Sequence, residues 1–218
     1  QDPQTVTGIG FDAFSYGGRL YGAPYALENV GLVVNTRLVK VPKTWAALEK
    51  EALAFKKKDA NNIGIAVPQG SAGDAYHMYP FFSGLGGYVF GRTKNGSLQA
   101  NRLGVANPVF LKNASMIDKW NREGLINSKV DYGTAKNAWL KGNAAFWITG
   151  PWEIDGLKAS GNPFRIVQLP KIKFRSVPFL GVQGTMVTKF AQTHGVTSLA
   201  KDLVANEMMK ASFQLDLE

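Results

Sequence analysis

Short apolar runs and longer stretches with helical spacing alternate along the chain. The runs cover residues 30–34, 63–67 and 144–148. Runs this short indicate strands that are buried on both faces. Between the first two runs, apolar residues recur at intervals of three, four and three, at Trp45, Leu48, Ala52 and Phe55. This spacing predicts a helix with one buried stripe, and Thr44 is its expected N-cap.

Further elements follow from capping and turn residues. We expect helices near Asp74, from Asn107 to Gly124, over 134–141, after Trp152 and over 198–210, and strands over 166–169 and 181–187. Gly17 and Gly18 lie between Tyr16 and Tyr21, which is typical of a tight hairpin. Strands that alternate with helices favour an α/β domain with a layered, mostly parallel sheet flanked by helices.

The composition excludes several classes of protein. The 218 residues are 45% hydrophobic, which is enough to form a core, and they include no cysteine. A disulfide framework and a thiolate metal site are therefore excluded. The longest apolar runs are far shorter than the ~20 residues of a membrane-spanning helix.

The net charge of +9 makes an anionic partner worth considering. The densest basic clusters, residues 56–58 and 171–175, are short and are typical of solvated faces. No nucleic-acid-binding motif accompanies them, so we expect no nucleic acid partner.

Catalysis finds little support. The sequence contains no Gly-x-Ser-x-Gly elbow, no phosphate-binding loop and no His-Glu-x-x-His pair, so we expect no enzyme, no cofactor and no metal. Glu153 and Asp155 are two residues apart and would point to different faces of a helix. Glu28 with Asp74 remains a conceivable carboxylate pair for a glycoside hydrolase, which is the alternative from another class.

Five residues at the ends of predicted elements suit a sugar: Glu28, Asp74, Tyr76, Tyr79 and Trp152. A pyranose offers C–H bonds to an aromatic ring and hydroxyls to carboxylates. Trp152 follows a predicted strand and a Gly-Pro turn, where open α/β sheets bind ligands. Alternatively, its indole is buried and packs the following helix against the sheet. If it binds sugar, we expect its ring and that of Tyr76 to form parallel plates around a glucose unit.

The order of several segments resembles that of bacterial maltose and maltodextrin-binding proteins. These segments are 14–28, Leu32–Asn35 with Pro42–Trp45, 86–90, Asp131–Tyr132, Lys141–Ala145, Gly150–Trp152 and 178–184. The resemblance covers about residues 11–210. It implies a periplasmic-binding-protein-like fold, whose two lobes close on an oligosaccharide, and delivery of that sugar to an ABC transporter permease.

The resemblance also implies roles for single residues. Glu28 lies at a hinge crossing, Asp74 and Tyr76 match the acid and the tyrosine of a Glu-Pro-Tyr loop, and Trp152 matches a stacking tryptophan. Tyr79 stands where a relative has a tryptophan near the site. The chain departs from the family pattern at Asp74, which is shorter than glutamate, and at Thr149, which replaces an asparagine.

The family pattern further implies that the chain is truncated. Residues 1–28 are expected to belong to the N-terminal lobe, 29–182 to form a C-terminal-type lobe, and 183–218 to return to the other lobe. Residues 198–210 would then lack their normal partner, and a domain-swapped or non-native dimer could supply one. The expected ligand is maltose or maltodextrin, in a periplasmic or lipid-anchored extracellular setting. A binding protein for another solute is the closest alternative.

Overall fold

The computed structural model describes residues 3–210 and 212–213, and these form two compact units. One unit comprises residues 30–179, and the other combines residues 1–29 with 180–218. The expected assignment of 1–28, 29–182 and 183–218 to the lobes of a larger protein stays a prediction. In the described ranges, no helix has the length and apolar character needed to cross a membrane.

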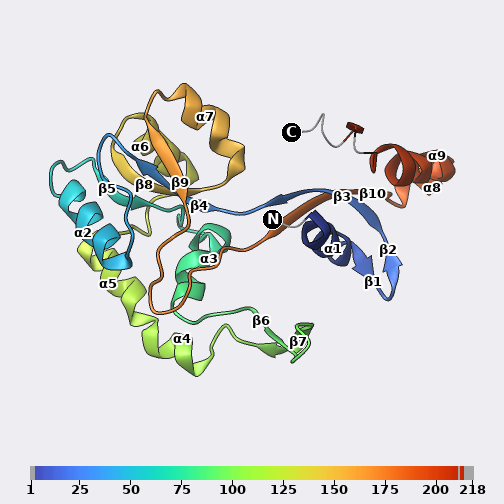
Figure 1. The fold of residues 1–218 in the computed structure, drawn as a ribbon, viewed down its shortest axis with the longest axis horizontal. Coiled ribbons are helices and arrows are strands. Elements are labelled where there is room, and N and C mark those ends of the chain that lie inside the picture. Colours follow the sequence, from blue (N-terminus) through green and yellow to red (C-terminus); the bar gives the residue numbers. More distant parts are fainter. Residues whose placement is uncertain (1–2, 211, 214–218) are drawn as a thin grey trace. The chain divides into compact units, whose positions relative to one another are not determined.

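The larger unit is built on a four-stranded sheet (Figure 1). Its strands, in spatial order, are β5 (Ile63–Ala66), β8 (Ala144–Thr149), β4 (Gly31–Asn35) and β9 (Phe164–Val167). This confirms the α/β class, but the expectation of mostly parallel pairing is wrong. Only β5 and β8 run parallel, whereas β4 is antiparallel to both β8 and β9. An apolar run indicates that a strand is buried on both faces, but it does not indicate the direction of the strand. An antiparallel strand between two layers of helices has the same apolar run as a parallel one.

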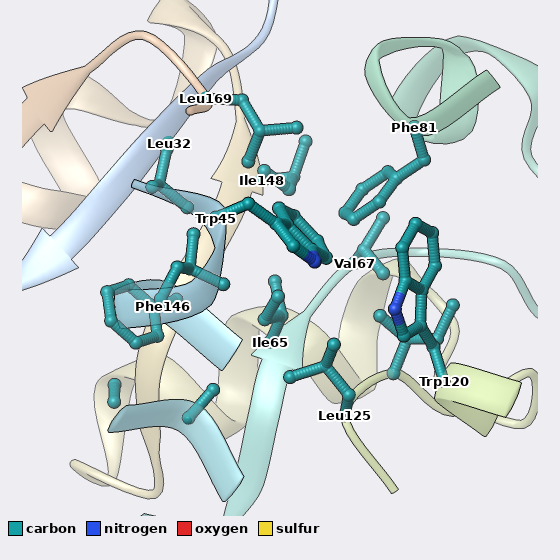
Figure 2. Packing of buried hydrophobic residues seen from close by; sticks show 14 of the residues in the cluster. Leu32, Trp45, Ile65, Val67, Phe81, Trp120, Leu125, Phe146, Ile148 and Leu169 are labelled. Atoms are coloured by element: carbon teal, nitrogen blue, oxygen red, sulfur yellow. The ribbon is translucent and has the colours of Figure 1, made fainter. Parts of the chain in front are cut away.

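One face of this sheet packs against α2 (Trp45–Lys56), α3 (Ala75–Gly84) and α5 (Ser115–Glu123). Figure 2 shows this core, in which Leu32, Phe146 and Ile148 of the sheet meet Trp45, Phe81 and Trp120 of the helices. The other face packs against α6 (Tyr132–Leu140) and α7 (Ile154–Ala159). Val33 and Trp147 point to that second core, so neighbouring residues of one strand serve opposite layers.

The local signals for helices are mostly confirmed. The Thr44 hydroxyl accepts a hydrogen bond from Ala47 N, and the four predicted stripe residues of α2 are buried. Asn107 caps α4 (Pro108–Asn113), and Gly124, with φ of 75°, ends α5. The expected single helix between them is divided at Ala114.

The hairpin of β6 (Phe90–Arg92) and β7 (Leu98–Leu103) was not expected from the sequence.

The smaller unit centres on the antiparallel pair β3 (Gly22–Glu28) and β10 (Gly181–Met186). The predicted hairpin is confirmed as β1 (Ser15–Tyr16) and β2 (Arg19–Leu20), with positive φ at both intervening glycines. The phenyl ring of Phe14 lies against the backbone of Gly22 and Gly184, where a Cβ atom would come within 2.4 Å of it. The unit also contains α1 (Pro3–Ala13), α8 (Phe190–Thr193), α9 (Thr197–Asp202) and the π-helical turn η2 (Leu203–Glu207).

The helix expected over 198–210 forms only in part. It is an α-helix to Asp202 and a π-helix from there to Glu207. Its apolar side is largely exposed, since Leu199 is 69% and Leu203 is 50% accessible. The periodic pattern therefore predicted helical structure here, but not its change to a π-helix or its end at Glu207, and its stripe is not buried within the described part of the chain.

Candidate functional site

Two loops meet at one edge of the sheet of the larger unit. Because β5 and β8 are parallel, their carboxyl ends lie on the same side. The chain leaves β5 through residues 67–74 into α3, which carries Tyr76 in its first turn. It leaves β8 through Gly150 into the 3₁₀-helix η1 (Pro151–Glu153), which carries Trp152. The rings of Tyr76 and Trp152 therefore come together, with centroids 6.1 Å apart.

The indole of Trp152 lies at the surface. It is 42% exposed, whereas the other four tryptophans of the chain are buried. The alternative, in which this ring is buried and packs a helix against the sheet, is thus wrong. The six-membered part of the indole lies over Gly150, where a Cβ atom would come within 2.2 Å of Trp152 Cζ3. The glycine of the Gly-Pro turn is what makes room for this ring.

The two rings do not form parallel plates. Their planes are inclined by 47°. Two parallel rings with a pyranose between them would lie about 7–8 Å apart, twice the ~3.5–4 Å carbon contact distance. At 6.1 Å no sugar ring fits between them. We refer to Trp152 and Tyr76 together as the aromatic platform, because they form one bent surface that a ligand can cover from outside.

A hydrogen-bonded network that ends on the buried Glu153 fixes the indole from behind. Trp152 Nε1 donates a hydrogen bond to Tyr132 Oη (2.7 Å), and the Tyr132 hydroxyl donates to Glu153 Oε1. The Glu153 carboxylate is only 4% exposed, and Lys136 Nζ lies 3.1 and 3.0 Å from its two oxygens. Burial, together with the hydrogen bond and charge of Glu153, raises the pKa of Tyr132 to about 12. The phenol therefore stays protonated and keeps its place between indole and carboxylate.

Asp74 has a structural role at the start of α3. Its Oδ1 accepts a hydrogen bond from His77 N (3.0 Å), and its Oδ2 lies 2.8 Å from His77 Nδ1. The imidazole of His77 is buried beneath the platform, 5.8 Å from the Tyr76 ring and 5.9 Å from the Trp152 ring. Asp74 is 27% exposed, so its carboxylate also faces solvent beside the platform.

Tyr79 lies on the next turn of α3 and does not join the platform. Its ring meets Phe179 edge to face at 4.5 Å and lies 5.6 Å from Phe82. These side chains line a pocket of about 590 Å³ together with Ala75, Tyr76, Met78, Val89, Val105 and Ile117. Since the aromatics of α3 cover several faces, the sequence left open whether the helix is deeply buried or lends rings to a pocket. Phe81 belongs to the core, and Tyr76, Tyr79 and Phe82 line the pocket.

Glu28 belongs to the other compact unit. It is the last residue of β3, half-buried, and pairs with Gly181 of β10. Its expected contact with sugar stays a prediction. Glu153 is buried and Asp155 is exposed, so these two carboxylates do not share a site. Within the described ranges, no three acidic or histidine side chains gather in a way that could hold a metal ion.

Sequence reasoning missed the network behind Trp152. Tyr132 appeared only as part of the family resemblance, and Glu153 only as a rejected catalytic candidate. The helix predicted over 134–141 includes Lys136 but not Tyr132, whereas the observed α6 begins at Tyr132, so that the two residues lie four apart and share a face. That both reach Glu153 depends on how α6 packs beside η1, which the sequence pattern does not reveal.

Comparisons with known proteins agree on one family. The profile of bacterial extracellular solute-binding proteins matches residues 4–217. A galactooligosaccharide-binding protein of Bacillus subtilis is 28% identical over 87% of this chain and 46% of its own length. A maltodextrin-binding protein of the same organism is 27% identical over 91% of this chain and 49% of its own length.

A solved structure adds the fold. The maltotriose-binding protein of Thermus thermophilus, bound with maltotriose, is 32% identical and superposes with a TM-score of 0.74. The match covers 90% of this chain and 53% of that one. The chain thus spans about half the length of the relatives it matches.

Proposed function

Because the chain belongs to the bacterial extracellular solute-binding proteins, we propose that it binds a maltodextrin without chemical change and contributes part of the sugar-binding surface. The observation that carries this proposal is the aromatic platform. Trp152 is the one exposed tryptophan of five, and a hydrogen-bonded network that ends on the buried Glu153 holds its indole in place. A ring fixed in this way loses little freedom on binding, so more of the stacking energy appears as affinity.

The platform suits one face of a glucose unit. The C–H bonds of a pyranose face carry partial positive charge, and the faces of the Trp152 and Tyr76 rings carry partial negative charge. The bend of 47° lets two successive units of a curved α-linked chain each meet one ring. In this arrangement Asp74, at the edge of the platform, accepts hydrogen bonds from sugar hydroxyls through lone pairs that His77 does not use.

The remaining roles rest on the resemblance to the family. Glu28 is proposed to contact sugar hydroxyls, and Tyr79 to lie beside the bound chain without stacking on it. The relatives are named as binding proteins, which supports binding rather than hydrolysis. Delivery to an ABC transporter permease and an extracytoplasmic setting, with or without a lipid anchor, are proposed on the same basis.

The identity of the sugar can be decided by competition. Two of the relatives are named for maltodextrin and maltotriose, and one for galactooligosaccharides. We expect maltotriose to bind more tightly than a galactotriose of equal size, because an α-glucan chain curves enough to follow a bent surface. Isothermal titration calorimetry with both trisaccharides measures the difference. Tighter binding of the galactotriose would contradict the maltodextrin assignment and leave sugar binding intact.

The role of the platform is tested by the variant Trp152→Ala. We expect its affinity for maltotriose to fall by about tenfold or more, since each ~1.4 kcal/mol of lost stacking is a factor of ten. Phe190→Ala is the matched control, because Phe190 is an aromatic residue of the other unit and is 63% exposed. If both variants bind maltotriose as the unchanged protein does, the platform is not the sugar site.

A further inference from the structure

The pocket beside the platform is chemically unlike a sugar site. Apart from the tyrosine hydroxyls, its nine lining residues offer only apolar side chains, and carbon atoms form nearly all of the exposed lining. Sugar hydroxyls placed there would lose their hydrogen bonds to water without finding partners, which costs about 1–3 kcal/mol for each group. The volume of about 590 Å³ lies within the ~300–1,000 Å³ typical of ligand pockets. An occupant of this pocket must therefore be apolar.

The walls of the pocket are held by contacts outside it. The Phe82 ring meets Phe110 edge to face at 4.5 Å. It also lies against Gly87, where a Cβ atom would come within 2.3 Å of the ring. On the other side, the rings of Tyr79 and Phe179 support each other at 4.5 Å. Side chains braced in this way keep the pocket open without a ligand, so filling it needs little rearrangement.

Tyr76 connects the pocket to the platform. Its ring centroid lies 6.1 Å from that of Trp152 and 6.5 Å from that of Phe179, which lines the pocket. The two surfaces therefore share one ring as a wall. A ligand that stacks a sugar on the platform can carry an attached group directly into the pocket.

We propose that the pocket formed by Tyr76, Tyr79, Phe82 and Phe179 binds the apolar aglycone of an aryl or alkyl glycoside whose sugar lies on the aromatic platform. This inference rests on the proposed sugar binding and adds amphiphilic glycosides to the ligands of the same site. The sugar supplies stacking and hydrogen bonds on the platform. The aglycone supplies apolar area that leaves water on binding.

The test compares two ligands that differ only in their aglycone, methyl α-maltoside and 4-nitrophenyl α-maltoside, by isothermal titration calorimetry. We expect the nitrophenyl compound to bind at least about tenfold more tightly, because its ring leaves water for an apolar pocket. Equal affinities for the two maltosides would overturn the pocket proposal while leaving sugar binding in place. Failure of both maltosides to bind would overturn the proposed function as well, so the two failures are distinguishable.

Substitutions in the pocket test whether the higher affinity for the nitrophenyl compound comes from contacts there. Val105 lines the pocket, is 52% exposed and does not belong to the platform. Val105→Asp brings a charge into the pocket and Val105→Phe fills it, so both should reduce the nitrophenyl-to-methyl affinity ratio to about one while the methyl compound binds as before. The matched control is Val41→Asp, at a valine outside the pocket that is 40% exposed. If this control lowers the nitrophenyl-to-methyl affinity ratio as much as the Val105 variants do, the higher affinity for the nitrophenyl compound does not come from the pocket and the proposal is wrong.

Discussion

The orientation of one indole depends on a glycine two residues before it. The Trp152 ring occupies the space that a Cβ atom on Gly150 would need. The backbone at Gly150 is extended, with φ of −120°, so alanine is compatible with the main chain itself. A methyl group there would act on the ring alone and push it out toward solvent.

We therefore predict that Gly150→Ala weakens maltotriose binding by about tenfold, comparable to loss of stacking, while the free energy of unfolding changes by less than about 1 kcal/mol. The ring is already 42% exposed, so its displacement leaves the core unchanged. Calorimetry measures the binding, and urea denaturation measures the stability. Gly142→Ala is not a suitable control, because its φ of 74° adds backbone strain. Gly8→Ala serves instead, since Gly8 lies in α1 of the other unit and a Cβ atom there would meet open space.

The phenol of Tyr132 gives the fold a distinct response to alkaline pH. Its ordinary pKa is 10.0, and burial beside the Glu153 carboxylate raises it to about 12. Below pH 10 the phenol is protonated in both the folded and the unfolded chain. Between pH 10 and 12 the unfolded chain releases this proton and the folded chain keeps it, so stability falls as the pH rises.

The change Tyr132→Phe should remove this part of the pH dependence. We expect the unchanged protein to lose more of its free energy of unfolding between pH 9.5 and 11.5 than the variant does, as measured by urea midpoints at both pH values. All other side chains are the same in the two proteins, so their contributions cancel in the comparison. The variant should also bind maltotriose several-fold more weakly at pH 7, because the Trp152 indole loses its hydrogen-bond partner. Equal slopes for the two proteins would show that Tyr132 is not held by the carboxylate.

At the scale of elements, α3 joins structure and binding through its first residues. Asp74 caps the helix and pairs with the buried His77, the first turn carries Tyr76, and the next turn carries Tyr79. A carboxylate that fixes the start of the helix also fixes where these rings point. Asp74, which is proposed to contact sugar hydroxyls, thus also caps the helix. Substitutions at Asp74 can separate these two roles.

We predict that Asp74→Ala lowers the free energy of unfolding by about 1–2 kcal/mol, since it removes an N-cap and leaves His77 Nδ1 without its partner. Asp74→Asn should keep most of the cap through its amide oxygen, and lose maltotriose affinity if the charge contacts hydroxyls. Thr44→Ala removes a comparable cap from α2, away from the platform, and should lower stability alone. Unchanged affinity in Asp74→Asn would restrict Asp74 to its structural role.

Local signals predicted the elements better than their pairing. Thr44 and the stripe after it, Asn107 with its proline, and Gly124 each act within a few residues, so the sequence alone contains their information. The direction of β4 against β8 is set by packing between segments more than 100 residues apart in the chain, which a local pattern does not record. For the same reason the α/β class was predicted correctly and the mostly parallel sheet was not.

The candidate site shows the same limit. The surface position of Trp152 followed from its place after a strand and a Gly-Pro turn. The plane of its ring is set by Tyr132 on α6 and His77 on α3, which come from two other parts of the chain. The expected parallel plates were wrong because residue types and spacing do not specify such contacts.

At the scale of the whole molecule, the positive charge and the proposed ligand do not match. The net charge is +9, whereas a maltodextrin is neutral. The platform consists of uncharged rings, and the carboxylate beside it, Asp74, is paired with His77. Stacking and hydrogen bonds to neutral hydroxyls are screened little by salt, because no long-range charge attraction contributes to them.

We therefore predict that the dissociation constant for maltotriose changes by less than about twofold between 50 and 500 mM NaCl, where the Debye length falls from about 14 to 4 Å. A partner that binds through the basic surface would behave differently. A nucleic acid neutralised by six to ten cationic groups loses about 10³–10⁵ in affinity between 50 and 200 mM salt. Parallel titrations with maltotriose and with a single-stranded oligonucleotide, at three salt concentrations, separate the two modes of binding. Maltotriose binding that weakened steeply with salt would mean that cationic side chains, and not the aromatic platform, dominate recognition.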